Sequence, residues 1–101
     1  MRPVTRSESS IQRAVIDYAR SQGCLCKKME VGRFGSSGWP DYLVLYDAEV
    51  LFIEFKRKGL KPTPLQESVH QDLRAHGFNV YVVDDVEYGK NLITDFINGR
   101  L

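Results

Sequence analysis

The chain has 101 residues and a net charge of +1, from 14 lysines and arginines against 13 acidic residues. This length suits one folded domain, and a hydrophobic share of 43% with so little net charge excludes a disordered chain. No apolar run reaches the ~20 residues that a membrane-spanning helix needs, and the N-terminus lacks the apolar core of a secretory signal. Cys24 and Cys26 would point to opposite faces of a strand and are poorly placed to bridge. We therefore expect free thiols and a cytoplasmic protein that contacts no membrane.

The N-terminal segment has the pattern of an amphipathic helix. Apolar residues recur there at helical spacing: Ile11, Ala14, Val15, Tyr18 and Ala19. We expect a helix over about residues 7–22, ended by Gly23. Thr5 and Glu8 have the spacing of a capping box at its start.

The rest of the chain predicts strands and two further helices. Four segments are rich in strand-forming residues: 24–30, 41–46, 50–56 and 78–83. The middle two are apolar at nearly every position, which is typical of strands covered on both faces, and they flank a turn at Asp47 and Ala48. Three glycines mark residues 32–40 as a loop. Helices are expected over 63–77, which opens with the capping residues Thr-Pro-Leu-Gln, and over 87–98.

The order of these elements predicts the fold class. Helix, strand, hairpin, helix, strand and helix indicate an α/β fold, with a small mixed sheet flanked by helices on both faces. The helix at 63–77 would cross over between the strands at 50–56 and 78–83. Such a crossover makes the two strands parallel.

Three charged residues gather at one end of the predicted hairpin. With the turn centred between Asp47 and Ala48, Asp41 lies opposite Glu54, and Lys56 shares their face of the sheet. Two opposed carboxylates repel each other and are costly to bury unless something neutralises them. A divalent cation that prefers oxygen ligands, Mg²⁺ or Mn²⁺, would do so. The alternative is a structural network of charged side chains at the end of the sheet.

The same residues carry a resemblance to a known family. Residues 38–41, Gly-Trp-Pro-Asp, followed by 54–56, Glu-Phe-Lys, resemble the PD-(D/E)xK nuclease signature. The chain is similar in more detail to the virus-type replication-repair nuclease branch, the VRR-NUC domain. That branch has a glutamine opening a helix, here Gln66, and a final G-x-x-V-x-V strand, here residues 77–82. An acid on the first helix, here Glu8, also belongs to its pattern.

The resemblance implies a restriction-endonuclease-like αβββαβ core, in a single nuclease domain over residues 1–101. The implied metal ligands are Glu8, Asp41, Glu54 and the backbone carbonyl of Phe55. The implied catalytic residues are Asp41, Glu54, Lys56 and Gln66, with Lys56 orienting the attacking water. Glu8 and Gln66 have an alternative role as helix-capping residues, and no organic cofactor is expected.

Basic residues near this site are candidates for contacts with DNA phosphates: Lys27, Lys28, Arg33, Lys58 and Lys61. No base-reading motif is evident, so we expect recognition of DNA structure rather than of sequence. Trp39 is either a core residue or a stacking surface. The last helix has an apolar stripe, which either meets a second copy of the chain or packs on its own sheet.

The resemblance implies a Mg²⁺- or Mn²⁺-dependent endodeoxyribonuclease that acts as a homodimer on branched DNA, such as four-way (Holliday) junctions, in DNA repair. A bacterial or phage-infected cell is the implied setting. The alternatives are a restriction-type or flap nuclease, or a catalytically silent nuclease fold kept as a DNA-binding module.

Overall fold

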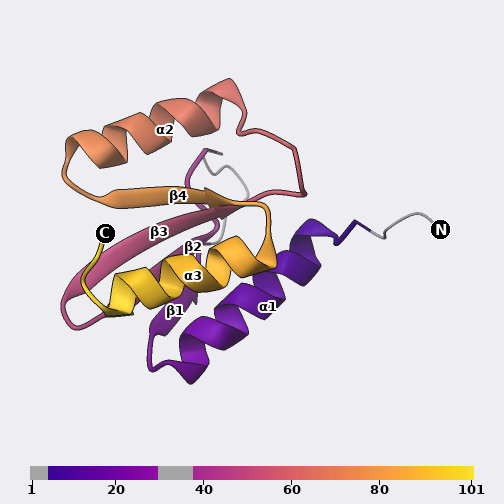
Figure 1. Ribbon diagram of the computed structural model, residues 1–101. Coiled ribbons are helices and arrows are strands. Elements are labelled where there is room, and N and C mark those ends of the chain that lie inside the picture. The colour runs from indigo at the N-terminus through magenta and orange to yellow at the C-terminus, as the bar shows by residue number, and fades with distance from the viewer. Residues whose placement is uncertain (1–4, 30–37) are drawn as a thin grey trace.

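The structure is a computed structural model that describes residues 5–29 and 38–101 (Figure 1). Its elements, in chain order, are α1 (Glu8–Ser21), β1 (Leu25–Lys28), β2 (Tyr42–Tyr46), β3 (Glu49–Phe55), α2 (Pro64–Ala75), β4 (Asn79–Val83) and α3 (Val86–Ile97). The predicted order is confirmed, with ends that differ by one or two residues. Arg33, an expected DNA contact, lies outside the described residues.

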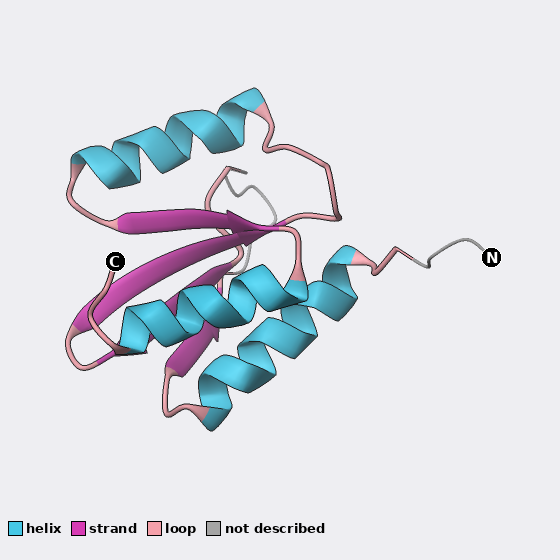
Figure 2. Ribbon diagram, viewed as in Figure 1, coloured by secondary structure: helices cyan, strands magenta, loops and turns pink. Residues whose placement is uncertain are grey.

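The sheet is mixed, as the sequence predicts. Its strand order is β1-β2-β3-β4; the first two pairings are antiparallel and the pairing of β3 with β4 is parallel. Helix α2 makes the crossover and covers one face of the sheet, while α1 and α3 cover the other (Figure 2). The α/β class with helices on both faces is therefore confirmed.

Strand β3 lies at the centre of both cores. Leu51, Ile53 and Phe55 face α1 and α3, whereas Phe52 packs with Leu73 of α2. Each buried apolar side chain of this size contributes roughly 1.5–3 kcal/mol. Burial on both faces accounts for the unbroken apolar run that the sequence shows here.

Helix α3 packs against α1 and β4 rather than facing solvent. Leu92, Ile93 and Phe96 are all buried in the core of the chain itself. Gly89 allows the close approach, because a Cβ atom there would lie 2.5 Å from Cγ2 of Val15. The apolar stripe of this helix is therefore core, and the expectation that it offers a dimer surface is wrong.

The start of α1 differs from the capping box expected of Thr5 and Glu8. The helix begins one residue later than predicted, so Ser7 is the N-cap, and its hydroxyl accepts a hydrogen bond from the Ser10 backbone N–H at 3.1 Å. Glu8 is then the first helical residue. Its carboxylate is exposed and plays no capping-box role.

The cysteines and the helix lengths bear on two further expectations. Cys24 is buried, Cys26 is half-buried, and both are free thiols, as expected. Burial raises the pKa of both thiols. None of the helices in the described part of the chain is long and apolar enough to cross a membrane.

Candidate active site

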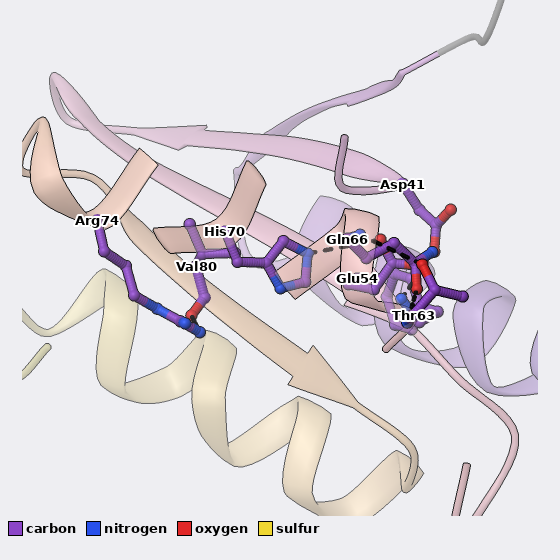
Figure 3. Close-up of polar contacts among 8 residues, drawn as sticks. Asp41, Glu54, Thr63, Gln66, His70, Arg74 and Val80 are labelled. Atoms are coloured by element: carbon purple, nitrogen blue, oxygen red, sulfur yellow. Dashed lines mark hydrogen bonds and ion pairs between the residues drawn. The ribbon is translucent and has the colours of Figure 1, made fainter. Parts of the chain in front are cut away.

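Asp41 and Glu54 meet at the open end of the β2–β3 hairpin. The register pairs Tyr42 with Ile53, so the next position places Asp41 opposite Glu54, as the sequence predicts. Oδ2 of Asp41 accepts a hydrogen bond of 2.7 Å from the backbone N–H of Phe55. This bond holds the Asp41 carboxylate against the end of β3 (Figure 3).

The residues before Asp41 are held against α2. Gly38 has φ +106, and a Cβ atom there would lie 2.9 Å from Cγ of Leu65, so this position requires glycine. Pro40 is fully buried, and the Asp41 carbonyl accepts a hydrogen bond from the Met29 N–H at 2.7 Å. The Gly-Trp-Pro-Asp motif thus fixes the backbone that presents the carboxylate.

Glu54 is a buried carboxyl group with one unsatisfied oxygen. Only 2% of the residue is exposed. Its Oε2 accepts a hydrogen bond from Nε2 of Gln66, while Oε1 has no hydrogen-bond partner among the described residues. Burial, and then the neighbouring Asp41 charge, raise the pKa of Glu54 to about 8, although Lys56 acts in the opposite direction. Below this pKa the carboxyl group holds its proton, and its ionised form is costly to bury unless a cation compensates the charge.

Gln66 links the start of α2 to the site. Its Oε1 accepts a hydrogen bond of 2.9 Å from the Thr63 N–H, and its backbone N–H donates to the Thr63 hydroxyl, completing a capping box. This bond to Oε1 turns Nε2 toward Glu54, to which it donates at 3.1 Å. The two roles that the sequence left as alternatives, helix cap and site residue, are therefore filled by the same amide (Figure 3).

His70 is a site residue that the sequence analysis missed. It is 1% exposed, and its Nε2 lies 3.8 Å from Oε1 of Glu54 (Figure 3). Burial lowers the pKa of His70, which favours the neutral imidazole. The signal was present in the sequence, because Gln66 and His70 are four residues apart and so share one face of the predicted helix.

Glu8 and Lys56 lie near this group without a direct contact to it. The charge of Glu8, at the start of α1, is among those that raise the pKa of Glu54. Lys56 is half-buried, and its backbone N–H donates to the Val83 carbonyl at 2.9 Å. Within residues 5–29 and 38–101, no three His, Cys, Asp or Glu side chains are grouped closely enough to hold a metal ion.

The donor atoms nevertheless fit a hard divalent cation. Oε1 of Glu54 is buried, with no hydrogen-bond partner in the described part of the chain, and Asp41 lies opposite Glu54 in the hairpin register. The N–H and C=O of one strand residue point the same way, so the Phe55 carbonyl faces the side on which its N–H meets Asp41. The Phe55 ring is buried edge-on to Tyr42, so only the backbone reaches the site. Oxygen donors of these types suit Mg²⁺ or Mn²⁺.

The expected DNA contacts lie on two sides of this site. Lys27 and Lys28 are exposed on the edge strand β1. Lys58 and Lys61 are exposed after β3, but the Lys58 ammonium lies 3.7 Å from Oδ1 of Asp85, which partly offsets its charge. Trp39 is 44% exposed with its ring edge-on to Phe52, so it combines a core contact with an open face.

Comparisons with known proteins show which family has this fold. No family model matches the chain. A solved VRR_NUC domain has a TM-score of 0.77 and 30% identity, over 90% of this chain and 99% of that one. The chain is also 37% identical over 78 residues to "Putative nuclease p44" of Acyrthosiphon pisum secondary endosymbiont phage 1, over 76% of this chain and 82% of the phage protein. The chain belongs to the VRR-NUC family.

Membership confirms the family that the motif residues indicated. The VRR-NUC chain shares the fold of the solved domain over nearly the whole length of that domain, and it is a nuclease, a hydrolase of nucleic acid. The candidate site residues of the VRR-NUC chain come from the position just before β2, from β3 and from α2, which the fold brings to one end of the sheet.

Proposed function

We propose that this VRR-NUC nuclease is a Mg²⁺- or Mn²⁺-dependent endodeoxyribonuclease that hydrolyses phosphodiester bonds in branched DNA, such as four-way junctions. The observation that carries the proposal is the buried Glu54 carboxyl group, which lies opposite Asp41 and whose Oε1 has no hydrogen-bond partner among the described residues. Keeping two carboxyl groups together in this position costs stability unless a cation binds them. The cost is consistent with a site maintained for function.

Three oxygen donors would hold the cation directly. Asp41 and Glu54 supply carboxylates and Phe55 supplies its backbone carbonyl, while Glu8, exposed at the start of α1, would reach the cation through a water molecule. When bound, the cation lowers the pKa of a water molecule and shields the phosphate charge. Gln66 keeps the Glu54 carboxylate oriented through the bond from Nε2.

Lys56 provides the positive charge on the same face as Glu54. Its ammonium group would donate hydrogen bonds to the attacking water and to a phosphate oxygen, which orients the nucleophile and opposes the growing negative charge. The water attacks phosphorus directly and the 3′ or 5′ oxygen leaves, so no covalent enzyme intermediate is required.

The branched substrate is supported by the lack of a base-reading motif in the sequence, which favours recognition of DNA structure. Resolving a four-way junction requires two symmetric cuts, so the proposal includes a homodimer. The dimer surface would include Trp39 and Leu65, which are exposed and lie close together because Gly38 packs on Leu65. A cytoplasmic location is part of the proposal, supported by the two free cysteines.

A cleavage assay tests the proposal. Wild-type protein is incubated with a four-way junction, a flap and a linear duplex, in Mg²⁺, in Mn²⁺ and in EDTA. We expect metal-dependent cutting, fastest on the junction. Lys56→Ala should fold and bind DNA but lose at least ~100-fold in rate, whereas Arg100→Ala, at an exposed position beyond α3, should cut as the wild type does.

Each alternative function would give a different result in the same assay. A flap nuclease would cut the flap in preference to the junction, and a restriction-type enzyme would cut linear duplex at defined sequences. A silent DNA-binding module would bind the junction without cutting it in either metal. Cleavage by Lys56→Ala at the wild-type rate would contradict the assigned role of that residue.

A further inference from the structure

A second polar surface lies on the opposite side of the sheet from α2, beside the candidate active site. A groove of about 390 Å³ runs between α1 and the ends of β1 and β2 that lie nearest the site. Apart from the acid Asp17, its polar lining side chains are basic or neutral: Ser9, Gln12, Arg13, Arg20, Lys28 and Tyr42. Helix α1 and strand β1 lie next to each other in the fold (Figure 1), and Lys28 pairs with Tyr42 across the two strands. The groove is therefore built by the helix on one side and the sheet on the other.

The charge of this groove is predominantly positive. Arg13, Arg20 and Lys28 face a single acid, Asp17. None of the three cations takes part in an ion pair with another residue that the structure describes. Lys58, on the other side of the site, differs because Asp85 lies 3.7 Å away. The groove thus presents cationic groups that are available to an anionic partner.

The groove begins beside the candidate active site, at the start of α1. Ser9 directly follows Glu8, whose charge acts on Glu54, and Tyr42 directly follows Asp41, although the side chains of Asp41 and Tyr42 point to opposite faces of the sheet. From Ser9 to Arg20 the helix rises ~16 Å. DNA carries one phosphate per ~3.4 Å along each strand, so this length passes several phosphates of one strand.

We propose that this groove binds the sugar–phosphate backbone of the DNA that leads into the active site. Arg13, Arg20 and Lys28 contact phosphates, because guanidinium groups match phosphate oxygens in bidentate geometry and ammonium groups act as point charges. The hydroxyl and amide side chains of Ser9, Gln12 and Tyr42 add neutral hydrogen bonds to the same oxygens. The inference rests on the proposed function, since it places the substrate of that site.

Salt-dependent binding tests the groove. The affinity for a four-way junction is measured by fluorescence anisotropy in EDTA, where no cutting occurs, across a series of salt concentrations. Arg13→Gln and Arg20→Gln should each reduce the slope of log affinity against log salt by about one. Arg100→Gln is the matched control, because Arg100 is exposed and pairs with Asp95 at the far end of α3. It should keep the wild-type slope.

A gain in affinity separates the proposal from loss of folding. Asp17→Asn removes the one acid of the groove and should bind several-fold tighter at low salt, while the exposed Asp72→Asn on α2 should bind as wild type. Thermal melting should be the same for all variants. Unchanged slopes in both arginine variants, or equal effects of Asp17→Asn and Asp72→Asn, would overturn the proposal.

Cleavage by the wild type in Mg²⁺ distinguishes the two proposals. If the wild type cuts DNA but the arginine variants keep the wild-type slope of log affinity against log salt, the proposed role of the groove is wrong and the proposed nuclease site stands. If the wild type binds but does not cut, the metal-dependent site is wrong and the slopes still decide the groove. Wild-type protein that does not bind DNA in EDTA at low salt also overturns the groove.

Discussion

The Nε2 atom of His70 lies 3.8 Å from Oε1 of Glu54, and neither atom has a hydrogen-bond partner within the described residues. Both side chains are buried, so each unpaired atom has lost its hydration without replacement. The separation is too long for a direct hydrogen bond. Two unsatisfied polar atoms that face each other at the candidate metal site indicate a position shaped for function at the expense of stability.

We predict that His70→Leu leaves stability unchanged or raises it, because leucine removes a buried polar atom whose burial costs about 1–3 kcal/mol. Cleavage should fall, since the side chain beside Oε1 of Glu54 is no longer polar. Urea unfolding and the Mg²⁺ concentration for half-maximal cleavage measure the two effects. A large loss of stability with unchanged cleavage would show that His70 serves the fold alone.

Divalent cations should stabilise the protein through Glu54. Mg²⁺ binding to the folded state raises the melting temperature by mass action, and it compensates the charge of a buried carboxyl group. Glu54→Gln should melt higher than wild type in EDTA at pH 8 and show little further gain with Mg²⁺. Glu49→Gln, on the same strand but exposed, serves as the control and should keep the wild-type response. An equal Mg²⁺ shift in Glu54→Gln would remove this residue from the ligand set.

The metal-free protein should lose stability as pH rises through the range in which Glu54 titrates. The pKa of Glu54 is about 8 in the folded state against an ordinary value of 4.5. Between these values the folded state holds a proton that the unfolded state has released, so the free energy of unfolding falls with increasing pH. Unfolding in EDTA should therefore show the advantage of Glu54→Gln growing from pH 5 to pH 8 and levelling above it. A difference that is independent of pH would contradict the raised pKa.

The two roles of Gln66 can be separated with Thr63. Thr63→Ala removes the hydroxyl of the capping box and should cost about 1 kcal/mol, while the Thr63 backbone N–H still holds the Gln66 amide. Gln66→Ala should cost a similar amount and also lose the bond to Glu54. Only the second variant should cut slowly under conditions in which both are folded. Equal cleavage by the two would confine Gln66 to capping.

Ala48→Gly should stabilise the β2–β3 hairpin. Asp47 and Ala48 form its two-residue turn with φ of 49° and 65°, a left-handed backbone region that is unfavourable for alanine. Glycine relieves that strain, and we expect a gain of about 0.5–1 kcal/mol in thermal or urea unfolding. Ala14→Gly, inside α1, should instead lose about 1 kcal/mol. A destabilised Ala48→Gly variant would mean that the turn is not strained.

The sequence alone determined the features that depend on neighbours along the chain. The two-residue turn sets the register of the hairpin, and the register places Asp41 opposite Glu54. The Thr63–Gln66 capping box was equally visible, because its atoms lie within one helical turn. The predicted Thr5–Glu8 capping box is wrong. Ser7, also a good capping residue, directly precedes the first helical residue and caps the helix instead.

Only the tertiary structure decided how surfaces distant in the sequence are used. The stripe on α3 could have met a second chain, but Gly89 lets the helix pack against Val15, and the stripe becomes core. Likewise, the packing of α2 places Nε2 of His70 3.8 Å from Oε1 of Glu54, too far for a hydrogen bond, and Oε1 has no other partner among the described residues. The physical reason is that the hydrophobic effect depends on the apolar area removed from water, and any apolar surface that the fold brings close can cover it, however distant in the sequence. A sequence pattern therefore shows that a face is apolar or polar, and the packed fold determines what that face meets.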